Sequence, residues 1–396
     1  MAKNTHLEHL EDDILNNGSD GGKNAIAFLK ELGDMLHQKS SSISVTTKWD
    51  GAPAIVCGVD PQTNLFFVGT KSVFAKTEPK ICYHEEDIDL WYTGQLAAKL
   101  KLCLKHLKKL NITGVLQGDL LFTDDKSVQT INGERVISFR PNTITYAVDI
   151  QSPLADIIKT AKIGIVFHTK YTGETIPEMS ASFGANTSNL TKTSDVYVAS
   201  ASFTDATGIA NFTEPEYRKY ISAVNRAEGS LKQASKFLDV LTSTGESKFI
   251  MSKLFKMYFN TYVKNGKRLP NVREVTSQFS NYYSDVLDKE IMSKKTKTTK
   301  NKYLKMKIDG LNFIQKNKQS VYMTVASYMN LQTAKTIVIR QLEKVKSLGT
   351  FINTEDGYRQ TSPEGFVAIK SGSALKLVDR LEFSKANFTV AKNWDK

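Results

Sequence analysis

The sequence predicts an α+β protein in which antiparallel sheets are interrupted by a large basic helical insert. Two changes of hydrophobic period carry this prediction. Helical spacing gives way to strand-like runs after about residue 40, and it returns between residues 213 and 346. The third observation is charge: residues 214–346 hold 26 Lys and Arg against 11 Asp and Glu, a net of +15, which leaves −3 for the rest of the 396-residue chain.

Residues 1–40 are expected to form a helical segment that packs on the rest of the chain. The stretch NAIAFLKELGDMLHQ places apolar side chains at helical spacing. The stretch THLEHLED puts His6 and His9 one turn apart on a helix. A capped amphipathic helix explains that spacing more simply than a pair of metal ligands.

Residues 41–212 are predicted to form the first part of the sheet domain, because β-branched and aromatic runs lie between turn formers. The expected strands lie in SISVTTKWDGAPAIVCGV, NLFFVGTKSVF, ITGVLQGDLLF, RVISFRPNTITYAVDI, KIGIVFHTKY and DVYVASASF. One helix, TGQLAAKLKLCLKHLKKL, interrupts them. Strands with few helices between them favour antiparallel pairing.

Residues 213–346 form the predicted insert, and residues 347–396 return to the sheet domain. Within the insert, the lysine-rich run Met292–Lys307 is predicted to be a linker or loop between helices. In the last part, SPEGFVAIKSGSALKLVDRLEF is predicted to form a hairpin that turns at Ser371 and Gly372.

Composition restricts the class of protein. With 40% apolar and 24% charged residues, the chain is predicted to be an ordinary soluble protein. It has no apolar run near the ~20 residues that cross a bilayer, so we expect a cytoplasmic monomer without a membrane partner. Cys57, Cys82 and Cys103 are odd in number and widely spaced, so we expect reduced, mostly buried thiols.

The regional positive charge predicts a polyanionic partner, nucleic acid in particular. Lys and Arg that neutralise phosphates release condensed counterions, and this release drives binding. The alternative is a solvated helix face on a basic protein.

The sequence contains two Lys-x-Asp-Gly motifs, and the lysine of either one is a candidate nucleophile. Lys48 ends an alternating strand and precedes a Gly-Ala-Pro turn, so its ammonium is expected to project from a rigid strand end where backbone approaches a ligand. Lys307 lies among apolar residues at helical spacing and is interpreted as a helix-surface lysine. Four-residue motifs occur readily by chance, so their sequence context must decide.

The residues downstream of Lys48 resemble the ordered motifs of the covalent nucleotidyltransferase superfamily, which includes ATP-dependent DNA ligases, RNA ligases and capping enzymes. Those motifs are matched, in order, by Lys48, Asp119 in LQGDLLF, Tyr146 to Asp149 in ITYAVDI, Glu364 to Val367 in EGFV, and Lys376. The resemblance covers residues 43–212 and 347–390. HLEHLED followed by KWDGAPA is also similar to uncharacterised ligase-like proteins of large tailed phages, which implies the host cytoplasm as the location.

The resemblance implies an ATP-dependent polynucleotide ligase that uses ATP and Mg²⁺. Lys48 would attack the α-phosphate as a free amine, which requires a lowered pKa. Lys370 and Lys376 would supply the neighbouring cations and neutralise phosphate oxygens. AMP would pass from the lysyl-AMP intermediate to a 5′-phosphate of DNA or RNA, and a 3′-hydroxyl would then seal the strand, in a nicked duplex.

The resemblance also implies nucleotide-binding roles. Asp119 would hold the ribose hydroxyls, Tyr146 would lie on the adenine face, and Thr46 would face the adenine edge. Lys71 would touch sugar or phosphate, and Glu364 would position metal or nucleotide. Asp50 and Gly51 belong to the same Lys-x-Asp-Gly motif as Lys48, so the resemblance implies that they also form part of the nucleotide site. The plainer alternatives are a core tyrosine, a turn-capping Asp119, a solvated Lys71 and an incidental Glu364.

The chain departs from the family at several positions. Asp119 replaces the usual Glu, Val148 stands where many ligases carry a stacking aromatic, and the last motif has one lysine. The 20 residues that come after Lys376 are too few for the C-terminal OB-fold domain that DNA ligases and capping enzymes use. We expect the insert to replace that domain as the nucleic-acid clamp, with residues such as Tyr282, Tyr283 and Tyr303 packing or stacking.

Other functions stay open at the level of sequence. One is a non-catalytic nucleic-acid-binding protein on a ligase-like scaffold, and another is a capping-type enzyme that uses GTP. An adenylyltransferase that acts on protein is a more distant alternative. Neither DNA, RNA nor a hybrid substrate is selected by the residues themselves.

Overall fold

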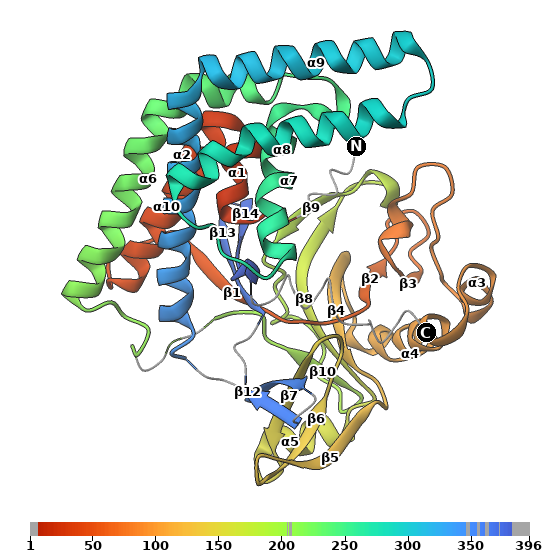
Figure 1. The fold of residues 1–396 in the computed structure, drawn as a ribbon. Helices are drawn as coiled ribbons and strands as arrows, with labels where there is room; N and C mark the ends of the chain where they lie inside the picture. The colour runs from red at the N-terminus through yellow and green to blue at the C-terminus, as the bar shows by residue number, and fades with distance from the viewer. Residues whose placement is uncertain are drawn as a thin grey trace.

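The computed structural model describes residues 7–203, 205, 208–345, 349–354, 357–360, 364–371 and 373–381. The helices before residue 40 and those between residues 213 and 346 gather on one side of the molecule, and the two larger β-sheets lie on the other side together with shorter helices (Figure 1). The predicted α+β class with antiparallel sheets is confirmed.

The smallest sheet joins the helices to the rest of the molecule. It contains β1 (Ser44–Lys48), β13 (Gly365–Lys370) and β14 (Ser373–Leu377) in the order β1-β13-β14, all antiparallel. The predicted terminal hairpin is therefore confirmed as β13 and β14, although Gly372 itself lies outside the described residues. One face of this sheet packs on the helices through Val45, Phe366, Ala368, Leu375 and Leu377. The other face is left for a cavity.

The six-stranded sheet faces that cavity from the opposite side. Its strands are β2 (Ala54–Val59), β3 (Phe66–Gly69), β4 (Val115–Phe122), β8 (Ile163–Thr172), β9 (Ser180–Phe183) and β10 (Val196–Ala199). Their order is β10-β8-β4-β2-β3 with β9 on β8, and β10 pairs with β8 in parallel while the other pairs are antiparallel. The predicted helix, α4 (Gly94–Leu107), packs on its outer face.

The third sheet has the order β12-β11-β7-β6-β5. Its strands are β5 (Lys126–Ile131), β6 (Glu134–Phe139), β7 (Ile144–Asp149), β11 (Gly349–Thr354) and β12 (Gly357–Gln360). The sequence did not predict β5, β9, β11 and β12, nor the short helices α3 (Glu85–Trp91) and α5 (Pro153–Thr160). Because β7 pairs with β11 and β1 pairs with β13, two sheets contain strands from both sides of the helical segment.

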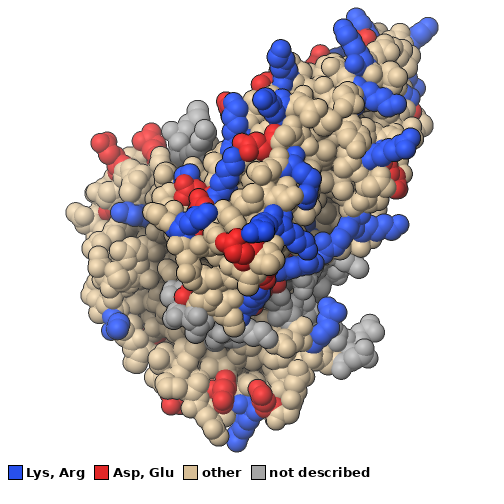
Figure 2. Space-filling view, turned by 90° about the vertical axis from the view of Figure 1, so that its left-hand side faces the viewer, with Lys and Arg blue, Asp and Glu red and all other residues tan. Residues whose placement is uncertain are grey.

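The predicted helical segment contains α6 (Glu214–Leu241), α7 (Met251–Lys264), α8 (Val272–Ser293), α9 (Lys297–Lys316) and α10 (Lys318–Leu342). It shares one hydrophobic core with η1 (Leu10–Asp12), α1 (Asp13–Asn16) and α2 (Gly18–Leu36). The N-terminal helices therefore belong to the helical part of the molecule. On the face shown in Figure 2, Lys and Arg side chains gather on the upper part of the surface and are sparse at the bottom.

Two local predictions are wrong. The lysine-rich run predicted as a linker is mostly α9, because Thr296 caps its N-terminus by accepting a hydrogen bond from the Thr299 N–H, and lysine has good helix propensity. The stretch THLEHLED, predicted to be a capped amphipathic helix, is not one over its described residues, because His9 forms a β-bridge with Lys376 and only Leu10–Asp12 form a short 3-10 helix. His6 lies outside the described residues.

The cysteines agree with expectation, and the length and polarity of the helices can also be stated. Cys57, Cys82 and Cys103 are buried free thiols. Over the described ranges, no helix has both the length and the apolar content that crossing a bilayer requires.

Candidate active site

A cavity of about 270 Å³ lies between the three-stranded and six-stranded sheets. Predicted site residues Thr46, Lys48, Lys71, Asp119 and Lys376 all line it. It is also lined by Trp49, Ala54, Gln117, Val166, His168, Thr169, Tyr171, Phe183, Val367 and Ile369, among others. Residues from four widely separated parts of the sequence therefore meet at one place.

Strand alternation explains the wall formed by the three-stranded sheet. Thr46 lies opposite Val367, and Val367 lies opposite Lys376, so the three form one row across β1, β13 and β14. Side chains two residues apart on a strand share a face, which brings Lys48 and Ile369 to the same side as this row. The apolar residues that alternate with this row, such as Val45, Ala368 and Leu375, pack into the core formed by the helices.

The opposite wall is a second cross-strand row with a bulge beside it. Ala54, Asp119 and Val166 lie opposite one another on β2, β4 and β8. The register shifts between Gln117 and Gly118, where Gln117 pairs with Thr169 and Gly118 pairs with Phe167, so His168 is the extra residue.

This bulge lets residues of both parities on β8 face the cavity, since Val166, His168, Thr169 and Tyr171 all line it. A Cβ at Gly118 would lie 2.5 Å from the Val166 carbonyl oxygen, so a residue with a side chain does not fit there.

Lys48 is held by carboxylates. Its ammonium forms an ion pair with Glu364, which immediately precedes β13, and the two side chains are 23% and 13% exposed. Burial works to lower the pKa of Lys48, but the negative charges of Glu364, Asp119 and Asp50 outweigh burial and raise the pKa above its usual value. The lowered pKa that a nucleophilic amine needs is therefore absent in this state of the site.

Lys376 behaves differently from Lys48. Burial and the nearby positive charge of Lys48 lower the pKa of Lys376. Its backbone N–H donates to the Glu8 carbonyl at 2.8 Å, which fixes the strand next to the N-terminal segment. The predicted second cation beside the nucleophile is thus in the cavity.

Asp50 and Gly51 do not line the cavity; they hold the strand end in place. Asp50 is 4% exposed, and its carboxylate accepts hydrogen bonds from Asn142 Nδ2, the Thr143 N–H and hydroxyl, and the Ile144 N–H, at 2.6 to 2.8 Å. A Cβ at Gly51 would lie 2.5 Å from the Asp119 Cβ, so glycine permits β4 to approach the strand end closely.

Tyr146 does not face the cavity either. It is 3% exposed, its ring packs on Trp49 at 4.9 Å and on Phe139 at 5.5 Å between centroids, and its hydroxyl accepts the Asp50 N–H at 2.7 Å. Tyr146 is therefore a core residue, which was the alternative to a nucleotide-binding role. Trp49 packs in the same core and also lines the cavity.

Lys370, expected to face the nucleotide, points elsewhere. Its ammonium pairs with Glu31 on α2 at 3.1 Å. The reason is parity: Lys370 is one residue beyond Ile369, which lines the cavity, so its side chain leaves the opposite face of the sheet. Lys376 alone supplies the proposed second charge from this hairpin.

Lys307 is a helix-surface lysine, as its context predicted. It lies on α9 and pairs with Asp288 on α8 at 2.6 Å. Gly310 of the same motif packs against the Tyr283 ring. The second Lys-x-Asp-Gly motif is therefore explained by helix packing.

The metal role assigned to Glu364 can be tested against the donors present. Across the described segments, no group of three or more His, Cys, Asp or Glu residues is arranged to hold a metal ion. Mg²⁺ usually needs only one or two protein carboxylates because substrate phosphates and water supply the other oxygens. Glu364 and Asp119, which both act on the charge of Lys48, are hard oxygen donors that suit it.

Several residues that line the cavity were not predicted from the sequence. His168 Nε2 lies 3.5 Å from an Asp119 oxygen and its Nδ1 lies 2.7 Å from the Thr169 hydroxyl, while Gln117 accepts from Tyr171 at 2.7 Å. Phe183 on β9 adds an aromatic ring. Gln117 and Asp119 share strand parity and could have been paired from sequence, whereas the bulge at His168 has no sequence signal.

Comparison with known proteins gives one match. A family model described as a family of unknown function, DUF6267, matches residues 4–392. No curated protein and no solved structure matches the chain.

Proposed function

The chain belongs to DUF6267, a family of unknown function, and from its cavity we propose that it is an ATP-dependent polynucleotide ligase working through a lysyl-AMP intermediate. The observation that carries the proposal is the convergence of Lys48, Asp119 and Lys376 on one cavity, with Glu364 paired to Lys48. These residues come from three separate strands and the turn before β13, and they were selected from sequence by motif order.

In this proposal different residues that line the cavity bind different parts of ATP. Val367, Ile369 and Phe183 offer apolar surface for a purine, and Asp119 offers a carboxylate for ribose hydroxyls. Lys376 and Lys71 offer positive charge to the triphosphate. Lys71 is exposed and has no side-chain partner among the described residues, so its charge is available.

Lys48 must lose a proton before it can attack the α-phosphate. Glu364 holds the ammonium in the nucleotide-free site, so release of that ion pair is part of activation. The amine then forms a bond to phosphorus, the bond to pyrophosphate breaks, and AMP remains on the lysine as a phosphoramidate. Glu364 would hold Mg²⁺, which when bound neutralises phosphate charge.

Nucleic acid is the proposed second substrate, DNA or RNA with a 5′-phosphate and a 3′-hydroxyl. The support is the net charge of +15 on residues 214–346, together with their position beside the sheet that carries Lys376.

The decisive experiment measures covalent adenylation. Purified protein exposed to ATP and Mg²⁺ should gain the mass of one AMP, and Lys48→Ala should abolish the gain because the nucleophile is lost. Lys307→Ala is the matched control from the second motif, and it should keep the label. Loss of the label in Lys307→Ala with retention in Lys48→Ala would overturn the assignment.

One observation favours the alternative of a non-catalytic nucleic-acid-binding protein. The ammonium of Lys48 is neutralised by Glu364 and its pKa is raised, as in a structural ion pair. Such a protein would bind nucleic acid with steep salt dependence and never gain AMP or GMP. Parallel incubation with GTP also separates a capping-type enzyme from a ligase.

A further inference from the structure

A second pocket, of about 370 Å³, lies in the helical part of the molecule, and we propose that it binds a single-stranded segment of nucleic acid through its phosphates. Its walls come from α6, α7, α10 and the residues after β14. Among the described residues that line the pocket, one is acidic, Asp379, and six are basic: Lys219, Lys267, Arg268, Lys335, Arg340 and Arg380.

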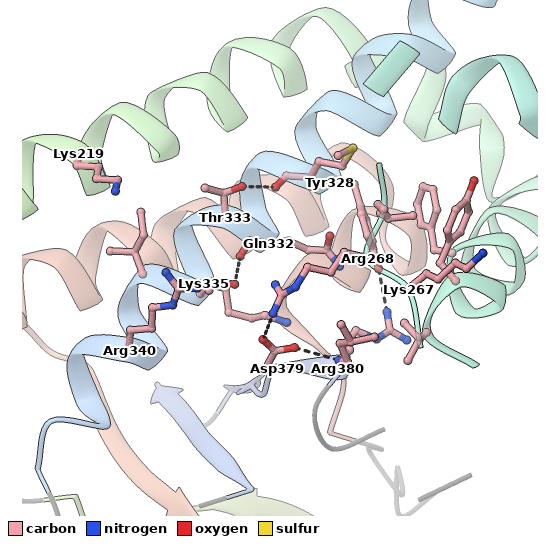
Figure 3. A pocket seen from close by; sticks show the side chains of 18 residues that line it. Lys219, Lys267, Arg268, Tyr328, Gln332, Thr333, Lys335, Arg340, Asp379 and Arg380 are labelled. Carbon is pink, nitrogen blue, oxygen red and sulfur yellow. Dashed lines mark hydrogen bonds and ion pairs between the residues drawn. The ribbon is translucent and has the colours of Figure 1, made fainter. Parts of the chain in front are cut away.

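Three of these cations are uncompensated. Within the described residues, the side chains of Lys219, Lys267 and Arg340 make no hydrogen bond or ion pair, and all three are exposed. Arg268 pairs with Asp379 at 3.0 Å. In Figure 3, Lys219 and Arg340 lie toward one end of the pocket, and Lys267 and Arg268 lie toward the other. An extended polyanion matches this spacing better than a single small ion.

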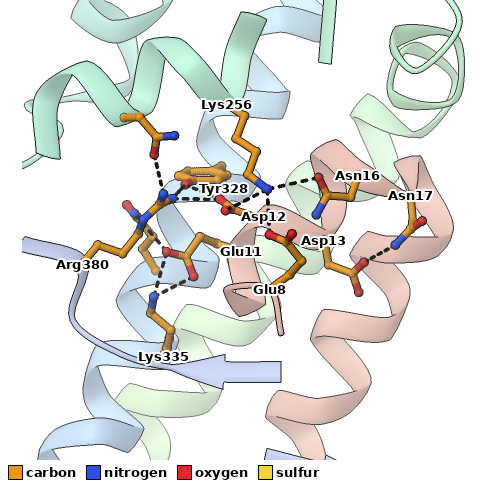
Figure 4. Close-up of polar contacts among 12 residues, drawn as sticks. Glu8, Glu11, Asp12, Asp13, Asn16, Asn17, Lys256, Tyr328, Lys335 and Arg380 are labelled. Atoms are coloured by element: carbon orange, nitrogen blue, oxygen red, sulfur yellow. Dashed lines mark hydrogen bonds and ion pairs between the residues drawn. The ribbon is translucent and has the colours of Figure 1, made fainter. Parts of the chain in front are cut away.

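The pocket floor is preorganised by a buried network. Lys335 donates to both oxygens of Glu11 at 2.7 Å, and Arg380 donates to Asp12 at 2.9 Å and to the Tyr328 hydroxyl at 2.8 Å (Figure 4). The N-terminal carboxylates therefore cancel the charge of the two buried cations. The positive charge that remains is at the rim, where a ligand can reach it.

Arg380 lies at the floor of the pocket. Its side chain is 10% exposed, and its buried Nε has no hydrogen-bond partner among the described residues. A buried guanidinium N–H without an acceptor is costly. Arg380 lines the pocket, and its Nη1 and Nη2 already donate to Asp12, Tyr328 and Asn260, so it belongs to the floor beneath the exposed cations.

Size and lining favour a single strand. The volume is that of a small-molecule site, which admits a nucleotide or two and excludes a duplex. Tyr262, half-buried and held by hydrogen bonds between its hydroxyl and both Tyr258 and Gln278, offers a ring for a base.

The pocket is close to the proposed active site along the chain. Lys376 lines the first cavity and Asp379 lines the second, and three residues span at most ~10 Å. We extend the proposal to a strand that continues from the pocket to the active site. Only this extension rests on the proposed function; the binding itself does not.

The test compares two triple variants that remove equal charge. The pocket variant is Lys219→Gln, Lys267→Gln and Arg340→Gln. The control is Lys105→Gln, Lys108→Gln and Lys192→Gln, which lie outside residues 214–346 and whose exposed side chains form no hydrogen bond or ion pair with the described residues. Binding of fluorescent single-stranded DNA and RNA is measured by anisotropy without ATP, over a series of salt concentrations. Duplex and inorganic triphosphate serve as separate probes.

We expect the pocket variant to lose about tenfold in affinity for single strands and to lower the salt slope by about 2, since each single-strand phosphate contact contributes roughly 0.7. The control should stay near the wild type. Equal losses in both variants, or a loss confined to duplex or to inorganic triphosphate, would overturn the proposal. Because no ATP is present, a failure to adenylate leaves this result intact.

Discussion

Lys48 is the residue on which the proposed chemistry depends, and its protonation predicts a pH profile. The carboxylates of Glu364, Asp119 and Asp50 keep the amine protonated, against the effect of burial. A group whose pKa lies above the working pH gains its free form about tenfold for each unit of rising pH. The rate of lysyl-AMP formation should therefore climb steadily between about pH 6 and pH 9.

Single-turnover labelling at constant ionic strength measures this profile. Circular dichroism at each pH serves as the control, because a loss of folded protein would flatten the curve for another reason. A rate that does not change across the range would show that deprotonation of Lys48 does not limit the step.

The contact between α8 and α9 shows why the second motif contains a glycine. A Cβ at Gly310 would lie 2.0 Å from the Tyr283 hydroxyl, which itself donates to the Met306 carbonyl at 3.0 Å. An alanine in a helix normally stabilises it by about 1 kcal/mol over glycine. Here the overlap should reverse the sign, and Gly310→Ala should destabilise the protein by about 1 to 3 kcal/mol.

Urea unfolding of the two variants Gly310→Ala and Gly229→Ala gives the comparison. Gly229 lies on the exposed surface of α6, and a Cβ added there would meet no heavy atom within 4 Å. Its substitution should follow the ordinary propensity and stabilise. If both substitutions stabilise equally, α9 does not pack on Tyr283.

The N-terminal segment ties the helical part to the strand that carries Lys376. Glu11 and Lys335 are 0% and 3% exposed, so Glu11→Ala leaves a buried ammonium without a counterion. Loss of one partner from such a pair should cost about 3 to 5 kcal/mol. Glu228→Ala, which breaks the half-exposed pair with Lys30 at 2.8 Å, should cost less than about 1 kcal/mol.

Denaturant unfolding measures both losses, and the double variant Glu11→Leu and Lys335→Met adds a check. Replacing both charges with apolar side chains should recover much of the stability lost by Glu11→Ala. No recovery would mean that the segment contributes through other contacts than this ion pair.

Local pattern alone determined the α+β class, the long helices, many of the strands, the terminal hairpin and the position of Lys307 on a helix, because apolar period and turn residues act within a few positions. These conclusions need no knowledge of distant contacts. The row of Thr46, Val367 and Lys376 does need it, because β1 pairs with β13 from the far side of the helical segment.

Only the tertiary structure decided which side chains reach the cavity. Lys370 turns to Glu31, Tyr146 packs behind Trp49, and the bulge at His168 brings in residues that no local pattern marks. It also placed the acidic N-terminus beneath the basic helices, so that part of the positive charge is cancelled inside the protein. The physical reason is that burial and ion pairing depend on which distant segments meet, and the sequence records each segment separately.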